Sequence, residues 1–252
     1  MIGGAADDQG AVGETERSRR VLVIIPALNE SETVASVVRQ ASALIGADVL
    51  VIDDGSIDDT GARARAAGAQ VLTLPFNVGV GAAIKVGVRY AHERGYEATL
   101  QLDGDGQHEA ADAHRLLEAI WSGADIAVGS RFAAGYDVRG LRRASMRILA
   151  ALIRRRLGTT VADTTSGFRA LGPRALDLFS EAYPTDYLSD TVEALWIAGG
   201  AGLRVVEIDV RMRGRQGGVA SSGAAKSSYH LVRMLLGLAV RSVRPTTRRK
   251  RG

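Results

Sequence analysis

Five short runs rich in β-branched and apolar residues recur along the first half of the chain, and a helix-length segment separates each from the next. The runs are VLVII (21–25), VLVI (49–52), VLTL (71–74), ATLQL (98–102) and ADIAV (124–128). Parallel strands need a crossover connection, usually a helix, so this alternation predicts βαβ units. We therefore expect an α/β fold with a mostly parallel central sheet and flanking helices.

Apolar residues at helical spacing mark the expected helices. Residues 30–45 and 109–122 each carry an apolar stripe that would face the sheet. Beyond residue 140 the alternation loosens. There the sequence predicts an amphipathic basic helix in ASMRILAALIRRRLG (144–158), a loop in DTTSGFRALGP (163–173), helices near 173–182 and 188–200, a strand at 203–210 and a last helix near 225–241.

The composition bounds the kind of protein. The chain has 252 residues, of which 46% are hydrophobic and 24% charged, which is typical of a folded globular protein. No cysteine is present, so any metal must be held by oxygen or imidazole ligands. We expect a disordered leader at 1–19, one catalytic domain at 20–223, and a C-terminal amphipathic helix with a basic tail at 224–252. No run reaches the roughly 18–20 apolar residues that span a bilayer.

The net charge of +4 comes largely from arginines between residues 131 and 156 and from the tail RSVRPTTRRKRG (241–252). Such clustering favours an anionic partner, and a solvated tail explains residues 241–252 equally well. The last helix and this tail suit an anionic membrane surface, although a core-packing helix fits the same apolar spacing. A nucleic-acid-binding module is disfavoured, because aromatic residues make up only 5% of the chain and no nucleic-acid motif is present.

The segment LQLDGDGQHEA (100–110) places Asp103 and Asp105 two positions apart, directly after an expected strand. Ligands of open parallel sheets bind beyond the carboxyl ends of the strands. Two carboxylates and the Gln107 amide there suit a hard cation such as Mg²⁺. An EF-hand is excluded, since His108 and His114 replace its required glycine and glutamate. Plain turn chemistry remains an alternative, and His108 ranks below the other three as a ligand.

Other ligand-binding motifs are weak or missing. NVGVGAA (77–83) has two of the three glycines of a dinucleotide-binding loop but follows the wrong strand, so it indicates a tight strand-to-helix turn, with Asn77 as a candidate to face a ligand. Walker A and G-x-S-x-G patterns are absent from the sequence, which disfavours P-loop hydrolysis and serine acyl transfer.

Six blocks, taken together and in order, resemble glycosyltransferase family 2 with the GT-A fold. They are VLVIIPALNESETVASVV, VLVIDDGSIDDTG, NVGVGAA, LQLDGDGQH, GSRF and TSGFRA. The likeness spans about residues 20–240 and is strongest to dolichol- and polyprenyl-phosphate mannosyltransferases.

On the donor side, this resemblance implies that a nucleotide-diphosphate sugar binds the loops after the first two strands. The residues concerned are Pro26, Leu28, Glu30, Asp53 and Asp54. Carboxylates suit this task because they accept hydrogen bonds from base N–H groups and ribose hydroxyls. As an alternative, Asp53 or Asp54 caps the turn that follows.

The same resemblance assigns Mg²⁺ or Mn²⁺ to Asp103, Asp105 and Gln107, where the cation would stabilise the charge on the leaving diphosphate. It also implies phosphate contacts for two arginines, Arg131 of GSRF and Arg213, with Arg215 as a substitute. The lysine expected after Arg213 is not evident among residues 217–222, which leaves that contact in doubt.

On the acceptor side, Arg142 and Ser145 resemble a site for a polyprenyl phosphate. That phosphate is already ionised at neutral pH, so its attack on the anomeric carbon needs positioning and no general base. A sugar-hydroxyl acceptor would need a base, and Asp186 or Asp190 is then the candidate. Asp190 is equally interpreted as the cap of the following helix.

The resulting hypothesis is an inverting, metal-dependent hexosyltransferase that uses a GDP- or UDP-sugar and a polyprenyl phosphate. We expect it at the cytoplasmic membrane face, bound directly or through a membrane protein, with no nucleic-acid partner. Transfer to a sugar hydroxyl in an envelope polysaccharide is the alternative. A nucleotidyltransferase is disfavoured, because PALNE after the first strand contains no glycine.

Overall fold

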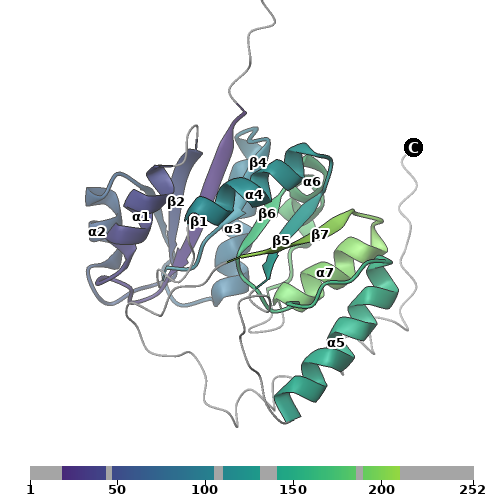
Figure 1. Ribbon diagram of the computed structural model, residues 1–252. Helices are drawn as coiled ribbons and strands as arrows, with labels where there is room; N and C mark the ends of the chain where they lie inside the picture. Colours follow the sequence, from purple (N-terminus) through teal and green to yellow (C-terminus); the bar gives the residue numbers. More distant parts are fainter. Residues whose placement is uncertain (1–18, 44–46, 105–109, 131–140, 186–189, 211–252) are drawn as a thin grey trace, which may run out of the picture.

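The computed structural model describes residues 19–43, 47–104, 110–130, 141–185 and 190–210 (Figure 1). The strands are β1 (Val21–Ala27), β2 (Ala47–Asp53), β3 (Gln70–Thr73), β4 (Ala98–Gln101), β5 (Ile126–Ser130), β6 (Arg169–Leu171) and β7 (Val205–Asp209). The helices are α1 (Val34–Ser42), α2 (Thr60–Ala66), α3 (Val80–Glu93), α4 (Ala110–Trp121), α5 (Leu141–Leu157), α6 (Pro173–Ala182) and α7 (Asp190–Gly200).

The seven strands form one sheet in the order β3-β2-β1-β4-β6-β5-β7, and every pairing is parallel except the two made by β6. The predicted α/β class with a mostly parallel sheet is confirmed. The prediction of a loop throughout 163–173 was wrong, because Arg169–Leu171 pairs antiparallel with both β4 and β5. A strand of three residues is too short to show a period in the sequence, and its two neighbours specify it instead.

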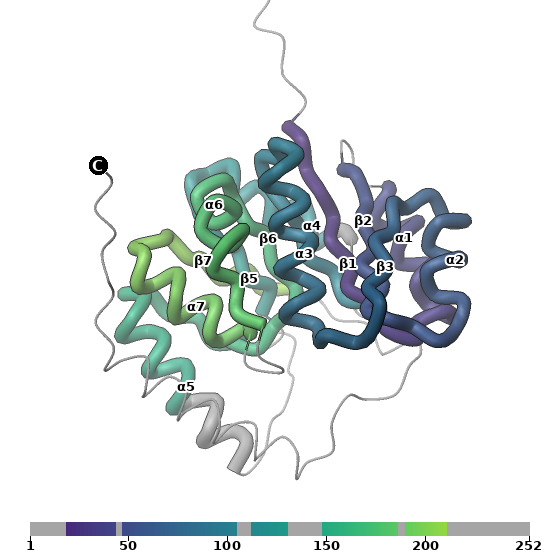
Figure 2. The backbone as a smooth tube through the Cα atoms, turned by 180° about the vertical axis from the view of Figure 1, so that it is seen from behind, coloured from purple at the N-terminus to yellow at the C-terminus, as the bar shows by residue number. Residues whose placement is uncertain are grey.

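Helices cover both faces of the sheet (Figures 1 and 2). Along β1, Leu22 and Ile24 face a core shared with α3, α5, α6 and α7, whereas Val21, Val23 and Ile25 face a second core shared with α1, α2 and α4. Because successive strand residues point to opposite faces, this doubly covered strand is apolar throughout. For this reason the run VLVII does not alternate between apolar and polar residues.

The first helix is shorter than predicted. It begins at Val34 and ends at Ser42, where the apolar spacing suggested residues 30–45. The preceding residues form a turn in which the amides of Thr33 and Val34 both donate to the Glu30 carbonyl. Apolar periodicity is set by the buried face, so it locates a helix without fixing its ends. Residues 1–18 of the expected leader and the expected last helix lie outside the described residues.

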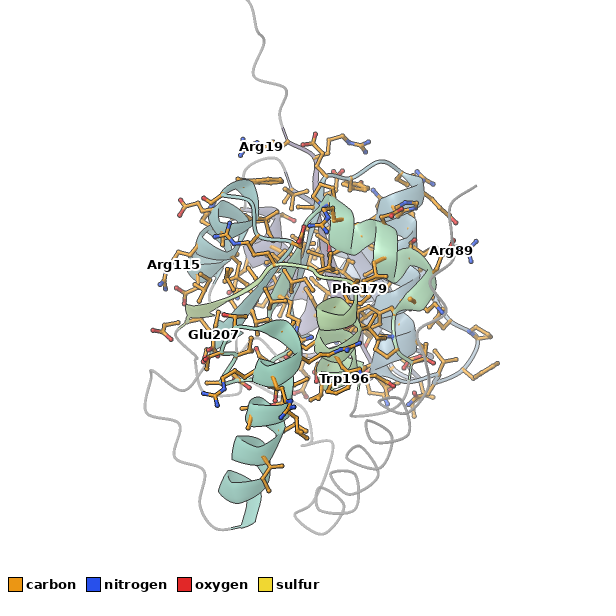
Figure 3. The ribbon with its side chains drawn as sticks, turned by 90° about the vertical axis from the view of Figure 1, so that its right-hand side faces the viewer. Arg19, Arg89, Arg115, Phe179, Trp196 and Glu207 are labelled. Carbon is orange, nitrogen blue, oxygen red and sulfur yellow. The ribbon has the colours of Figure 1, made fainter. Side chains whose placement is uncertain are left out.

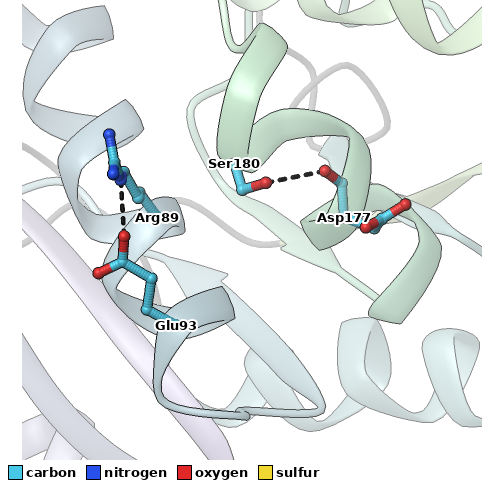
Figure 4. Close-up of polar contacts among 4 residues, drawn as sticks. All are labelled: Arg89, Glu93, Asp177 and Ser180. Carbon is cyan, nitrogen blue, oxygen red and sulfur yellow. Dashed lines mark hydrogen bonds and ion pairs between the residues drawn. The ribbon is translucent and has the colours of Figure 1, made fainter.

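Two polar contacts are typical of the outer surfaces of α3 and α6. On α3, Arg89 Nε lies 2.7 Å from Glu93 Oε1, and on α6 the Ser180 hydroxyl donates to the Asp177 carbonyl (Figure 4). Figure 3 shows Arg89 at the edge of the molecule, while Phe179 lies among the core side chains. Exposed ion pairs contribute little to stability, so the two apolar cores hold the sheet and helices together. Within the described part, no helix is both long and apolar enough to cross a membrane.

Candidate active site

The loops after β1 and β2 are joined by hydrogen bonds at the carboxyl edge of the sheet. The Asn29 amide donates to Ser56 Oγ at 3.0 Å, and the Ile57 amide donates back to Asn29 Oδ1 at 3.0 Å. The Glu30 amide donates to Thr60 Oγ1 at 2.8 Å. Asn29 has a φ of 54°, a left-handed conformation that asparagine tolerates better than most residues. The two loops expected to bind the nucleotide are thus one pre-formed unit.

Asp53 and Asp54 both carry structural hydrogen bonds. Asp53 Oδ1 accepts the Ser56 amide at 3.0 Å, which closes the turn after β2. The two oxygens of Asp54 accept the amides of Val78 and Gly79, at 2.8 and 2.9 Å, just before α3. A carboxylate is favoured at a helix N-terminus, where amide groups lack partners. Both residues therefore cap turns, and their contact with a nucleotide remains a prediction.

The loop after β3 joins that strand to α3, as the turn interpretation of NVGVGAA predicted. Asn77 Oδ1 accepts the Gly79 amide at 3.0 Å, so this side chain supports the turn. A Cβ added at Gly81 would lie 2.9 Å from both the Pro184 carbonyl and Asp190 Cβ. Glycine is required there because the start of α3 touches the segment that leads into α7.

Asp103 lies just beyond β4, beside the loop that follows β1. A Cβ added at the next residue, Gly104, would lie 3.3 Å from the Pro26 carbonyl and 3.5 Å from Glu30 Cγ. A Cβ added at Gly167 would lie 2.8 Å from Asp103 Oδ1. The Asp103 carboxylate is partly exposed and rests on the bare backbone of Gly167. Pro26 and Glu30 thus lie beside Gly104, the residue after Asp103, and the binding roles of all three site residues remain predictions.

An oxygen-rich strand terminus of this kind fits a hard divalent cation, although the structure describes only one of the three expected ligands. Asp105 and Gln107 lie outside the described residues, as does His108. Among the residues that are described, no three His, Cys, Asp or Glu side chains form a metal-binding group. The assignment of the cation to Asp103, Asp105 and Gln107 therefore remains a prediction.

Several predicted residues on the phosphate and acceptor sides also fall outside the described part. They are Arg131, Arg213, Arg215 and Asp186. Arg142 and Ser145 lie in the first turns of α5, where the structure describes the backbone but not these side chains. Leu28, in the loop after β1, is described and exposed.

Residues 161–168, in the loop between α5 and β6 (the 161–168 loop), form a part of the site to which the sequence assigned no role. Both carboxylate oxygens of Glu207, on β7, accept the amide of Ala162, at 3.0 and 2.9 Å, and one also accepts the Asp163 amide at 2.9 Å. Asp163, Thr164 and Ser166 are buried. This loop presents Gly167 to Asp103. The only sequence signal was the block TSGFRA, which marked the resemblance without indicating a function.

Asp190, the candidate base for a hydroxyl acceptor, begins α7 and is 3% exposed. Burial raises the pKa of its carboxyl to about 6, although the positive charge of Arg169 and amides of the first turn act in the opposite direction. Its position at the first residue of α7 agrees with the interpretation as a helix cap. A group so enclosed is poorly placed to receive a proton from an acceptor in solution.

The raised pKa of Asp190 predicts a pH-dependent effect on stability. Between about pH 4 and 6 the unfolded chain loses this proton while the folded protein keeps it, so the free energy of unfolding decreases as pH rises through this window. Relative to Asp190→Asn, the wild type should lose about 2 kcal/mol between pH 4 and 7. Urea unfolding of both proteins at four pH values measures this difference. The exposed Asp177→Asn is the control, and parallel curves for wild type and Asp190→Asn would contradict the prediction.

Comparison with known proteins settles the family. The model for "Glycosyl transferase family 2" matches residues 22–179, which is more than half of the chain and includes the β1, β2 and β4 loops and the 161–168 loop. The chain belongs to glycosyl transferase family 2. It is thus a glycosyltransferase, and its fold is the GT-A fold, as predicted.

Two curated relatives of this family 2 chain are similar over most of their lengths. Polyprenol monophosphomannose synthase of Mycolicibacterium smegmatis is 34% identical over 228 residues, covering 86% of this chain and 85% of the relative. Undecaprenyl-phosphate mannosyltransferase of Micrococcus luteus is 35% identical over 203 residues, covering 76% and 82%. The resemblance to polyprenyl-phosphate mannosyltransferases is confirmed.

A solved structure shows the same fold. Glucosyl-3-phosphoglycerate synthase from Mycobacterium tuberculosis, in complex with Mn²⁺, UDP and glucosyl-3-phosphoglycerate, superimposes with a TM-score of 0.71. The match covers 97% of this chain and 88% of that one, at 22% identity. At this identity the similarity concerns the fold alone.

Proposed function

We propose that the protein is an inverting hexosyltransferase that moves a sugar from a nucleotide diphosphate to a polyprenyl phosphate. The observation that carries this proposal is the similarity, over more than three quarters of the chain, to two enzymes whose names state polyprenyl-phosphate mannose transfer. Those names favour mannose among the hexoses. The donor is a GDP- or UDP-sugar, and the nucleotide is left to the experiment below.

The donor side of the site supports this chemistry. The joined β1 and β2 loops offer Pro26, Leu28 and Glu30 to the nucleotide, and Asp103 stands beside them at the end of β4. Mg²⁺ or Mn²⁺, when bound by Asp103 with Asp105 and Gln107, supplies positive charge that stabilises the departing nucleoside diphosphate. Because Gly167 lacks a Cβ, which would lie 2.8 Å from Asp103 Oδ1, the carboxylate keeps its position, and we expect little reorganisation during transfer.

A phosphate acceptor fits the acid–base groups of the described part better than a hydroxyl does. A phosphate monoester is ionised at neutral pH and attacks without a base, whereas a hydroxyl needs a partner that accepts its proton. Asp190 is buried at a helix start beside Arg169 and is unsuited to that task. Arg142 and Ser145 on α5 and the arginines Arg131 and Arg213 are the proposed phosphate contacts, which position the acceptor in line with the breaking bond.

We place the enzyme at the cytoplasmic face of the cell membrane, as a peripheral protein or with a separate membrane partner. On α5, Ile148 and Leu152 lie four residues apart and are exposed, at 54% and 38%, and Arg154, Arg155 and Arg156 end the same helix. Exposed apolar side chains followed by positive charge suit an anionic lipid surface. This surface is where a polyprenyl phosphate presents its headgroup.

The test is an assay in mixed micelles that contain undecaprenyl phosphate as the acceptor. The radiolabelled donors are GDP-mannose, GDP-glucose, UDP-glucose and UDP-galactose, each with and without Mn²⁺. We expect labelled product in the lipid phase that mild acid releases, because a glycosyl phosphate ester is acid-labile. Undecaprenol lacking the phosphate is the matched control and should accept no sugar. Label that enters only an added oligosaccharide would instead establish the hydroxyl-acceptor alternative.

A further inference from the structure

Arg169, the first residue of β6, is a buried arginine whose guanidinium donates hydrogen bonds to three backbone carbonyls. It is 3% exposed. Its Nε donates to the Ser166 carbonyl at 2.8 Å and its Nη2 to the Thr164 carbonyl at 3.1 Å. Its Nη1 donates to the Thr191 carbonyl, in the first turn of α7, at 2.8 Å. One side chain therefore joins the 161–168 loop to the start of α7.

The acidic groups near Arg169 come from separate segments of the chain. Burial lowers the pKa of its guanidinium, and nearby acidic groups raise it. Those groups belong to Tyr183, Asp190, Asp163 and Asp103. Arginine keeps its charge even when buried, so this cation offsets carboxylates that would otherwise repel one another. Asp103 is among them, and it also touches Gly167, two residues before Arg169.

Helix α7 packs against α5. Leu149 and Ile153 of α5 are buried in the core that contains α7. At the far end of this contact the Arg156 guanidinium lies 5.1 Å from the centre of the Trp196 ring, and a Cβ added at Gly199 would lie 2.9 Å from the Arg156 carbonyl. A continuous packed path thus runs from Asp103 through Gly167, Arg169 and α7 to α5.

We propose that Arg169 is a positioning residue for the transfer reaction, which fixes the donor side of the site at Asp103 relative to the acceptor side on α5. This inference rests on the proposed function for the role of α5, while the link from Arg169 to Asp103 stands on the structure alone. A planar guanidinium donates from three nitrogens in fixed directions, whereas the three donors of a lysine ammonium share one nitrogen. Lysine would keep the charge and lose this geometry.

The test compares Arg169→Lys and Arg169→Met with Leu176→Ala, a cavity-forming change on α6 in the core that also contains α3, α5 and α7. All are assayed as full-length protein at a temperature where circular dichroism and melting curves show each to be folded. Arg169→Lys should reduce kcat, measured at saturating donor, acceptor and Mn²⁺, by at least about 30-fold. It should also raise the Mn²⁺ concentration for half-maximal activity about tenfold, as is typical when a supporting group of a metal site is lost. Arg169→Met should be about tenfold worse again, because it also loses the charge. Leu176→Ala should lower the melting temperature and leave both parameters within twofold.

A purely structural role predicts a different result. In that case Arg169→Lys would lower the melting temperature as Leu176→Ala does, with kcat and the Mn²⁺ dependence unchanged, and the proposal would be overturned. Titration calorimetry of GDP or UDP at varied Mn²⁺ separates this from failure of the proposed function. Suppose that wild type transfers no sugar to polyprenyl phosphate. A higher Mn²⁺ concentration for half-maximal nucleotide binding in Arg169→Lys than in wild type still supports the link to Asp103, and an unchanged concentration refutes it.

Discussion

Replacing Asp103 with asparagine is expected to lower kcat/KM by about 10³-fold, which corresponds to about 4 kcal/mol of transition-state stabilisation. The two side chains have nearly the same shape, so the contact with Gly167 and the fold should be kept. The loss is one negative charge that would hold a divalent cation against the leaving diphosphate. Steady-state kinetics with the micelle assay, at Mn²⁺ concentrations up to 10 mM or so, measure the effect.

The matched control for Asp103→Asn is Asp177→Asn, which makes the same chemical change on the exposed surface of α6. Its activity should equal that of wild type. If Asp103→Asn retained normal turnover and normal dependence on Mn²⁺, the cation would have to bind elsewhere, and the assignment of the metal to the end of β4 would be wrong.

Gly167→Ala is expected to lower kcat/KM by about 10²-fold while leaving most of the stability intact. The new methyl group would lie 2.8 Å from Asp103 Oδ1 and 3.2 Å from Gln101 Nε2. Those atoms end side chains that can rotate away, so the fold accommodates the change. The carboxylate then leaves its working position, and displacements of about 1 Å in an active site cost about 10²-fold.

Gly68→Ala serves as the contrast to Gly167→Ala. Gly68 has a φ of 98° and open space where its Cβ would lie, far from Asp103 in the turn between α2 and β3. Backbone strain should lower the free energy of unfolding by about 1 kcal/mol or more without changing kcat/KM. The pair therefore separates strain from displacement of the site. Equal activity of Gly167→Ala and wild type would show that the position of Asp103 does not limit transfer.

Local patterns predicted most of the elements that are long and periodic. The apolar runs located β1 to β5, and helical spacing located α1, α4, α6 and α7 to within a few residues. They failed at β6, whose three residues are specified by strands from elsewhere in the chain. The parallel strands correctly predicted that the loops after β1 and β4 share one edge of the sheet, while the roles of Glu30 and Asp103 stay predictions. The motif alone did not distinguish the structural bonds of Asp53 and Asp54 from binding roles, because carboxylates serve both purposes.

The sequence by itself determined the α/β class and the family, and it predicted the end of the sheet at which we place the site, since alternating strand and helix patterns and six ordered blocks are local properties of the chain. Only the tertiary structure decided that Gly167 supports Asp103, that Arg169 joins the 161–168 loop to α7, and that Asp190 is enclosed. Glycine, arginine and aspartate at these positions look ordinary in one dimension. Their roles arise from contacts between residues 20 to more than 60 positions apart in the sequence. Such contacts depend on how strands and helices pack, and a periodic sequence pattern does not predict them.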